Sequence, residues 1–231
     1  MPRAAFLPAL GGASVTVIAE LKRRSPSRGA INEGMDLGSR ALSYAAGGAN
    51  AMSVLTEPSQ FGGSVDDLEV VARATRVPLL RKDFVVHRLQ LLEARAHGAS
   101  AVLLIARALP PALFASLALD ALAIGLDLLL EVRDESELER ALSVEHAAIG
   151  VNNRDLETLV VDHDTTARLL PLVPRDRIAV YESGVSGRRD VEHAAGLGAD
   201  AVLVGSSLSL AADPIAAVTA LAGVRREARA G

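Results

Sequence analysis

The chain has 231 residues, of which 50% are hydrophobic and 23% are charged, and its formal net charge is −4. This acidic balance argues against a nucleic-acid-binding protein, because such domains need a basic patch or stripe. The absence of cysteine excludes thiolate catalysis, disulfide bonds and cysteine metal sites. No apolar run is long enough for a secretory signal or a membrane span, so we expect a cytoplasmic protein with no membrane partner.

Short apolar runs with helical stretches between them organise the sequence. In chain order the runs predict strands at 16–21, 51–55, 78–82, 101–106, 127–132, 148–152, 178–183 and 201–205. Helical periodicity between them includes 64–75, 89–98, 134–142 and 190–198. Continuous apolar runs are typical of parallel strands buried on both faces. About eight strand–helix units without a linker predict one α/β domain over residues 1–231, a (β/α)8 TIM barrel with a short N-terminal segment over residues 1–15.

The two lysines are the first candidates for chemistry. Lys22 and Lys82 are the only lysines among 24 basic residues, and each lies at the end of a strand-like apolar run. A lysine ammonium exchanges its proton far more readily than a guanidinium, so a chain rich in arginine can retain lysine where a proton must move. Chance survival under a codon bias is the alternative that this feature alone leaves open.

Other polar residues also stand at the carboxyl ends of predicted strands, where barrels of this class place their active sites. Because side chains alternate along a strand, Glu20 and Lys22 share one face, as do Asn152 and Arg154. If Ile18 and Leu129 point into the barrel, Glu20, Lys22 and Glu131 do so too. Each could simply be a solvated turn residue, but the set of such residues predicts a catalytic rim: Glu20, Lys22, Lys82, Glu131, Asn152, Arg154, Glu182 and Ser183.

The last two predicted strands end in small residues. Ser183 and Gly184 follow one of them, and Gly205 and Ser206 follow the other. Small residues let backbone N–H groups approach an anion, and the loops after the last two strands are a frequent phosphate site in such barrels. Helix capping is the other interpretation of these residues.

Several familiar catalytic and cofactor-binding motifs are absent. The sequence contains no HExxH, no GxxxxGK[ST], no GxGxxG after a strand and no GxSxG. The five histidines, including His163, fall in helical or loop stretches away from strand ends. We therefore expect no metal site and no cofactor.

Taken together, the motifs resemble those of the indole-3-glycerol phosphate synthase family. VIAELKRRSPSRG, SVLTEPSQFGGS, PLLRKDF, GASAVLLI, LLLEV, IGVNNRDLETL, ESGV and AVLVGSSL occur in the family's order and extend from Val17 to Leu208. The combination of KxxSPSxG, LRKDF and NNRDLxT is specific, whereas no single piece would be.

The resemblance implies a lyase of tryptophan biosynthesis, acting on 1-(2-carboxyphenylamino)-1-deoxyribulose 5-phosphate. The product is indole-3-glycerol phosphate, formed by ring closure with loss of carbon dioxide and water. By the same resemblance, Lys82 is the acid that protonates the ketone, Lys22 is the cation beside the substrate carboxylate, and Glu131 is the acid/base of dehydration. The remaining positions that match are orienting groups Glu20 and Asn152, substrate contacts Ser25, Arg154 and Glu182, phosphate contacts Ser183, Gly184, Gly205 and Ser206, and an anthranilate slot of Phe84, Leu103 and Leu156.

Two departures from the family pattern bear on these expectations. Only about fifteen residues precede the first predicted strand, where the family has a longer segment with a helix over part of the barrel mouth. Gln60 stands where the family often has an aromatic residue beside Phe61. The first departure puts substrate affinity and pocket closure in question, and the second concerns the loop after the second strand.

Two other functions are compatible with parts of this pattern. Phosphoribosylanthranilate isomerase is a related barrel, but it typically uses a cysteine, and this chain has none. A catalytically silent barrel that binds a sugar phosphate or serves as a partner scaffold stays open. The sequence allows association with other tryptophan-pathway enzymes, and it leaves open the oligomeric state and the choice between primary tryptophan synthesis and a specialised indole pathway.

Overall fold

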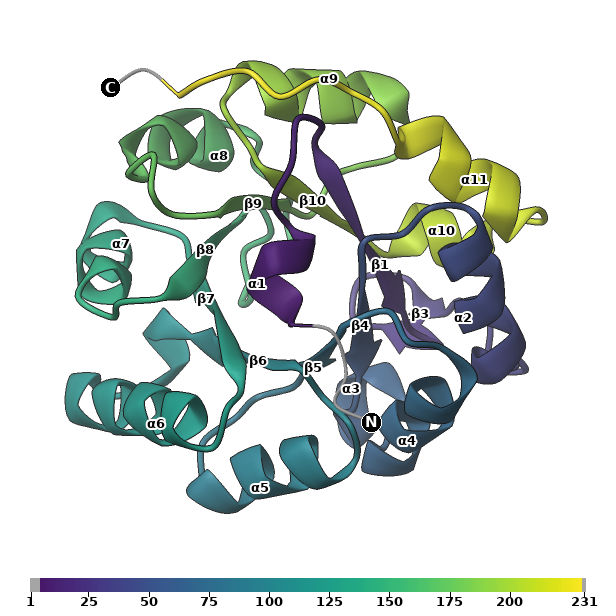
Figure 1. Ribbon diagram of the computed structural model, residues 1–231, viewed down its shortest axis with the longest axis horizontal. Helices are drawn as coiled ribbons and strands as arrows, with labels where there is room; N and C mark the ends of the chain where they lie inside the picture. Colours follow the sequence, from purple (N-terminus) through teal and green to yellow (C-terminus); the bar gives the residue numbers. More distant parts are fainter. Residues whose placement is uncertain (1–4, 230–231) are drawn as a thin grey trace.

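The computed structural model describes residues 5–229, and its centre is a closed barrel of parallel strands (Figure 1). Around the barrel the order is β1, β10, β9, β8, β7, β6, β5, β4, so neighbours in sequence are neighbours in space. The barrel strands are β1 Thr16–Leu21, β4 Ala51–Leu55, β5 Leu79–Lys82, β6 Ala101–Ile105, β7 Asp127–Val132, β8 Ala147–Asn152, β9 Ala179–Glu182 and β10 Ala201–Val204. The predicted barrel is confirmed, and each predicted strand agrees with an observed one to within one residue at either end.

Helices surround the barrel in Figure 1. They are α2 Leu37–Ala46, α3 Pro58–Phe61, α4 Val65–Ala74, α5 Arg88–Ala96, α6 Pro111–Ala123, α7 Glu135–Leu142, α8 Asp164–Leu169, α9 Arg188–Gly196, α10 Ser206–Leu210 and α11 Pro214–Leu221. Local sequence sets their starts: Asp36 and Asp134 cap α2 and α7 by accepting backbone N–H bonds, and Ser64 forms a capping box at α4. A two-stranded hairpin, β2 Arg24–Ser25 and β3 Gly29–Ala30, follows β1.

Strand alternation divides the apolar core into two layers. Inward residues such as Ile18, Leu80 and Leu129 fill the barrel, while outward residues such as Val17 and Met52 pack beneath the helices. Because Ile18 and Leu129 do point inward, the residues two positions further along their strands also face the interior. The strand pattern thus aims the charged strand ends into the mouth of the barrel.

The N-terminal segment closes the end of the barrel opposite that mouth. Helix α1, Phe6–Ala9, lies over the centre of the barrel in Figure 1, and Phe6 and Leu10 are buried with the inward residues. The backbone N–H groups of Phe6 and Leu7 donate to Asp127 Oδ2 at 2.7 and 3.0 Å, at the start of β7. The described part of residues 1–15 therefore covers the end of the barrel opposite the candidate site. Residues 1–4 lie outside the described range.

The C-terminal segment is fastened at the same far end by Arg229, which is 6% exposed. Its guanidinium donates to the carbonyl oxygens of Gly198, Pro174 and Arg177 and pairs with Asp200 at 2.7 Å. Gly198 has φ +84°, and a Cβ there would lie 2.2 Å from Arg229 Cγ. This glycine thus supplies both a left-handed helix end and room for the arginine stem.

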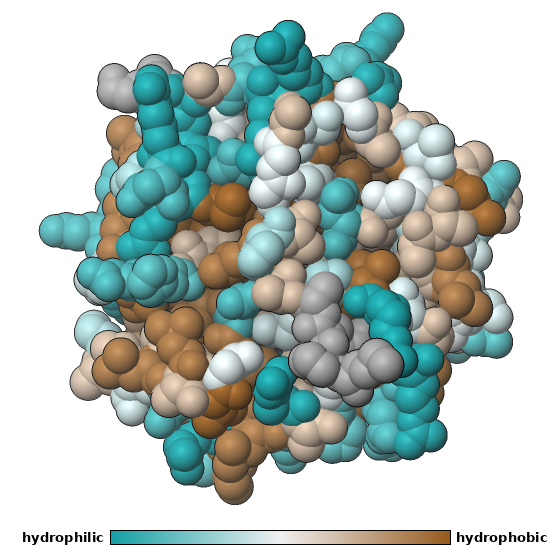
Figure 2. Space-filling view, viewed as in Figure 1, coloured by the Kyte–Doolittle hydropathy of each residue, from teal (hydrophilic) through white to brown (hydrophobic). Residues whose placement is uncertain are grey.

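The surface on the α1 side carries exposed apolar side chains, which Figure 2 shows at the lower left, over the position of α6 in Figure 1. Leu119 of α6 is 70% exposed, and Leu113 is also exposed. Within residues 5–229, no helix is both long and apolar enough to cross a membrane.

Candidate active site

A pocket of about 500 Å³ lies at the mouth of the barrel, where the carboxyl ends of the strands meet. Nearly all the residues predicted for the site line it: Glu20, Lys22, Lys82, Phe84, Leu103, Glu131, Asn152, Arg154, Leu156, Glu182, Ser183, Gly184, Gly205 and Ser206. Ser25 is the exception. It lies in β2, is buried, and is not among the lining residues.

Lys82 lies between two carboxyl groups in this pocket. Its Nζ is 3.3 Å from Glu131 Oε2 and 3.4 Å from Glu182 Oε2. Burial alone would lower the pKa of Lys82, but the surrounding carboxyl groups, Glu131 above all, outweigh burial and raise it above the ordinary lysine value. The pocket of the free protein is therefore lined by a protonated ammonium group.

Glu182 is the acidic group with the highest proton affinity here. Burial raises its pKa to about 8, and the nearby charges of Glu131 and Glu20 add to the rise, while Lys82 opposes it. Its Oε1 has no hydrogen-bond partner in the described part of the chain. The neighbouring strand makes room for this side chain, because a Cβ at Gly150 would lie 2.0 Å from Glu182 Oε1. A carboxyl group that keeps its proton at neutral pH can donate a hydrogen bond or a proton.

Glu20 and Lys22 form a second pair at the mouth, with Nζ and Oε1 2.7 Å apart. Burial alone would raise the pKa of Glu20, but Lys22 and Lys82 outweigh it and lower the pKa. Gly205 packs against this pair: a Cβ there would lie 2.1 Å from Glu20 Oε1 and 2.7 Å from Lys22 Nζ. Gly205 was predicted as a phosphate contact, and it also leaves the space that the ion pair occupies.

Asn152 connects three parts of the site. Its Nδ2 donates to Glu131 Oε1 at 3.0 Å, and its Oδ1 accepts from Arg154 N at 2.9 Å and Ser183 Oγ at 2.8 Å. All three interactions need an amide, because one end donates and the other accepts. Asn152 thus fixes the orientation of the Glu131 carboxylate relative to the Lys82 ammonium.

The loop after β9 has a strained backbone at the predicted anion site. Ser183 has φ +65° and Gly184 has φ +91°, so two consecutive residues lie in the left-handed region. The neighbouring Asn153, fully buried, donates from Nδ2 to Ser183 O at 3.1 Å and accepts from Thr166 N at 3.1 Å. Asn153 thereby connects this loop to α8. The strand-end pattern could not predict this role, because the Asn153 side chain points away from the pocket.

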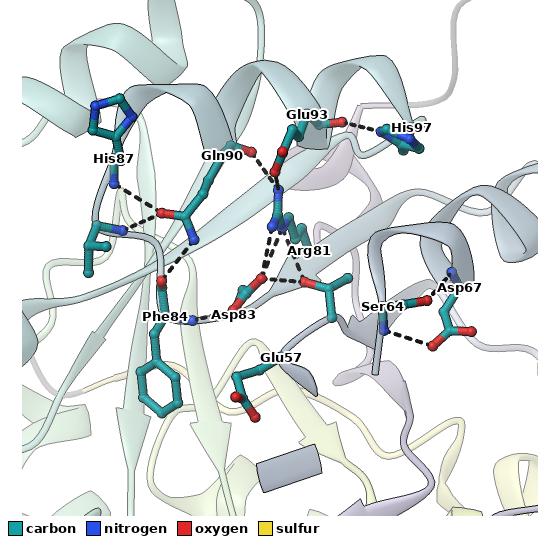
Figure 3. Close-up of polar contacts among 12 residues, drawn as sticks. Glu57, Ser64, Asp67, Arg81, Asp83, Phe84, His87, Gln90, Glu93 and His97 are labelled. Atoms are coloured by element: carbon teal, nitrogen blue, oxygen red, sulfur yellow. Dashed lines mark hydrogen bonds and ion pairs between the residues drawn. The ribbon is translucent and has the colours of Figure 1, made fainter. Parts of the chain in front are cut away.

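A buried arginine, Arg81, lies next to Lys82 in β5 and is the centre of a polar cluster in Figure 3. Arg81 pairs with Asp83 at 2.9 Å and donates to Thr56 Oγ1 at 3.1 Å and to Gln90 O at 2.7 Å. In Figure 3 the Phe84 ring points away from this cluster. The cluster therefore fixes β5 on either side of Lys82, with Phe84 turned toward the pocket.

Apolar side chains cover one part of the pocket wall. Phe84, Leu103 and Leu156 line it, together with Ile105 and Leu203. A flat aromatic group can be buried against such a wall while its polar substituents face the charged groups. The predicted slot residues are therefore brought together in the same pocket as the ammonium of Lys82.

Two lining residues with basic side chains were not predicted as site residues. Arg28, beside β3, and His163, just before α8, both border the pocket. Neither follows a barrel strand directly, so the strand-end rule could not find them. Among residues 5–229, no group of three or more histidine and acidic side chains is arranged to hold a metal ion.

Comparisons with known proteins agree with this geometry. The sequence profile described as "Indole-3-glycerol phosphate synthase" matches residues 4–221. A protein named indole-3-glycerol phosphate synthase from Mycolicibacterium vanbaalenii is 48% identical, over 93% of this chain and 79% of the relative. A protein of the same name from Nocardioides sp. is 49% identical, over 94% of this chain and 84% of the relative.

Among solved structures, a mutant tryptophan synthase α-subunit from the hyperthermophile Pyrococcus furiosus superimposes with a TM-score of 0.70 at 17% identity, covering 90% of this chain and 98% of that one. A thiamine phosphate pyrophosphorylase from the same organism gives 0.67 at 15%, covering 90% and 94%. At these identities the likeness supports the barrel fold alone.

Proposed function

Because the chain belongs to the indole-3-glycerol phosphate synthase family, we propose that the pocket around Lys82 carries out that family's reaction with the residue roles described below. The function is the conversion of 1-(2-carboxyphenylamino)-1-deoxyribulose 5-phosphate to indole-3-glycerol phosphate, a carboxy-lyase step of tryptophan biosynthesis. The observation that carries the assignment of roles is the ammonium of Lys82, held within 3.4 Å of two carboxyl groups in a pocket with an apolar wall.

Ring closure needs an acid. The ring carbon that bears the carboxylate attacks the ketone carbon, and the ketone oxygen takes up a proton as its negative charge develops. Lys82 is the donor, since its raised pKa keeps it protonated in the free enzyme and its position leaves it able to meet the oxyanion. The carbon–carbon bond to the carboxylate then breaks, and its electron pair restores the aromatic ring as carbon dioxide leaves.

Dehydration needs a proton for the departing hydroxyl and a base for the neighbouring carbon. Glu131 is the acid/base of this step, and Asn152 holds its Oε1 so that Oε2 stays near Lys82. Protons can therefore pass between Glu131 and the lysine that has just been spent. Glu182, with its pKa near 8, is a second proton store within reach of Lys82.

Charge complementarity supports the same substrate. The substrate carries a carboxylate and a phosphate, and three buried carboxyl groups in the pocket would repel it if they were unopposed. Lys22 and Lys82 compensate two of them, and Glu182 holds its proton at neutral pH.

Two arginines add to the positive charge at the mouth. Arg28 and Arg154 line the pocket and form no ion pair within residues 5–229, and Arg154 donates to the carbonyl oxygen of Leu159. We place the substrate carboxylate beside Lys22 and the phosphate at the predicted contacts Ser183, Gly184, Gly205 and Ser206.

The test uses the purified chain and the proposed substrate, with no added metal, nucleotide or redox cofactor. Indole fluorescence should rise over a low background, because the chain has no tryptophan and only two tyrosines. Chelator-treated and metal-supplemented samples should react at the same rate. If saturating substrate binds and no indole appears in any of these samples, the silent phosphate-binding barrel is the correct interpretation.

A further inference from the structure

His163 lines the pocket but has no part in the function proposed above. It stands between β8 and α8, in a segment bridged to Arg154 through Val161. Its side chain is exposed at the pocket rim, so a ligand in the pocket can reach it.

A buried phenol fixes the orientation of the His163 ring. His163 Nδ1 lies 2.6 Å from the hydroxyl oxygen of Tyr181, which is 1% exposed. The two rings stack with centroids 6.4 Å apart and an interplanar angle of 27°. Burial raises the pKa of Tyr181, so this phenol keeps its proton over the working pH range. The imidazole is thus held from one side by a rigid partner.

The ring of His163 also packs against the strained turn at the predicted phosphate site. A Cβ at Gly184 would lie 2.4 Å from His163 Cε1 and 3.2 Å from Nε2, so only glycine lets the ring approach this closely. Nε2 has no hydrogen-bond partner within residues 5–229. Asn153 keeps this arrangement together, because it binds both Ser183 O and Thr166 N.

The polar and acidic groups around His163 come from β9, from α9 and from its own segment. Tyr181 contacts it from β9, and Asp190 of α9 interacts with it electrostatically. Asp190 already accepts bonds from Ser186 Oγ at 2.6 Å and Gly187 N at 3.0 Å. Asp162 and Asp164 flank His163 in its own segment, and Asp162 accepts bonds from Asp164 N and Thr165 Oγ1. Nε2 is therefore available to an anion in the pocket.

We propose that His163 binds the phosphate group of the substrate and product through Nε2, and that Tyr181 is the positioning residue that holds its ring. The inference rests on the proposed function, which brings a phosphorylated ligand to the loop of Ser183 and Gly184. When the phenol donates to Nδ1, the neutral ring carries its proton on Nε2 and donates to phosphate. When the ring is protonated, it donates from both nitrogens and adds a positive charge, so affinity for phosphate rises as the imidazole takes up its second proton.

The experiment measures the dissociation constants of indole-3-glycerol phosphate and of its dephosphorylated form, indole-3-glycerol, between about pH 5.5 and 8, the range in which histidine titrates. The proteins are the unaltered chain, His163→Gln, Tyr181→Phe, and the matched control His97→Gln. His97 is a histidine at the end of α5 that hydrogen-bonds Glu93 O and does not line the pocket. The second ionisation of the phosphate, near pH 6, affects every protein alike, so the ratio between proteins isolates the histidine.

We expect His163→Gln to weaken binding of the phosphorylated product roughly tenfold at about pH 6 and by a smaller factor at about pH 8, as for one partly exposed charge-assisted hydrogen bond. Tyr181→Phe should give a smaller loss with the same pH trend, and His97→Gln should give none. Indole-3-glycerol should bind all four proteins equally.

Equal affinity of His163→Gln and the unaltered chain for the phosphorylated product would overturn the inference, as would an equal loss for the dephosphorylated ligand. Either result with normal turnover by the unaltered chain would leave the proposed function standing. Failure of the unaltered chain to bind or form the product would instead refute the proposed function.

Discussion

Replacing Lys82 by arginine separates proton donation from positive charge. Arginine keeps the charge between Glu131 and Glu182, but its guanidinium is bulkier and planar, so it does not hold a transferable proton where the Lys82 ammonium holds one. General acid catalysis contributes about 10² to 10⁴ in rate, equivalent to roughly 3 to 5.5 kcal/mol of transition-state stabilisation. Lys82 Nζ lies against both carboxyl groups, and with Lys82 as the proposed proton donor we expect Lys82→Arg to lower kcat by about 10³-fold.

The companion variant Lys82→Met removes the charge as well. It leaves Glu131 and Glu182 facing each other without a cation, so we expect a stability loss of about 3 kcal/mol and a melting temperature lower by about 6 to 12 °C. Lys82→Arg should melt within a few degrees of the unaltered chain. The assay is initial-rate indole fluorescence over a range of substrate concentrations, with circular dichroism to verify folding.

The pair of variants gives a clear refutation. If Lys82→Arg turns over within a few-fold of the unaltered chain while Lys82→Met is inactive, Lys82 acts only as a positive charge and the donor role is wrong.

Three further changes test the surroundings of the lysine and the far end of the barrel. Gly150→Ala should displace Glu182, whose Oε1 would lie 2.0 Å from the new methyl group, and cost about 1 to 3 kcal/mol together with activity; thermal unfolding and turnover unchanged from the parent would contradict this packing. Glu182 has a folded pKa of about 8, above its unfolded value, so its contribution to stability is full in acid and is lost as pH rises through about 8. Melting temperatures measured from about pH 5 to 9 should therefore fall less steeply for Glu182→Gln than for the unaltered chain. Parallel curves for the two proteins would argue against the raised pKa. Arg229→Ala should lower the melting temperature while kcat stays the same, since its bonds lie at the far end of the barrel; a loss of kcat at full folding would show that the two ends are coupled.

The fold could be predicted because its signals are local. Strands buried on both faces must be continuous apolar runs, and Thr16–Leu21 and Ala51–Leu55 were found with their observed limits. The position of the N-terminal segment against the barrel could not be predicted in the same way. The run around Phe6 is apolar and needs burial, but only the bonds to Asp127 show that it closes the far end.

The site was predictable where residues lie at the carboxyl ends of barrel strands. Glu20, Lys82 and Glu131 converge because alternation and barrel closure place them on one rim. Ser25, which was predicted with them, does not line the pocket, because it lies in the hairpin after β1 and is buried there. A motif match fixes a position in sequence, whereas the direction of a loop side chain depends on tertiary contacts.

The residues that sequence reasoning missed depend on such contacts. His163 reaches the pocket only because Tyr181 and Asn153, both pointing away from the barrel interior, hold its segment in place. The sequence feature that could have pointed to His163 is Tyr181, directly before Glu182. It is a large residue with a polar hydroxyl at an outward strand position, where that hydroxyl needs a partner. The space that Gly205 leaves for the Glu20 and Lys22 pair likewise involves residues far apart in the chain.

The measurement that tests the central claim most directly follows both products of the reaction at once. The purified chain is incubated with substrate carrying ¹³C in its carboxylate, and carbon dioxide and indole-3-glycerol phosphate are quantified over time. Lys82 as the acid of a decarboxylating ring closure predicts equal amounts of the two products from the unaltered chain and almost none of either from Lys82→Arg at matched folding. Bound substrate that keeps its labelled carboxylate in the unaltered chain, or full product formation by Lys82→Arg, would contradict it.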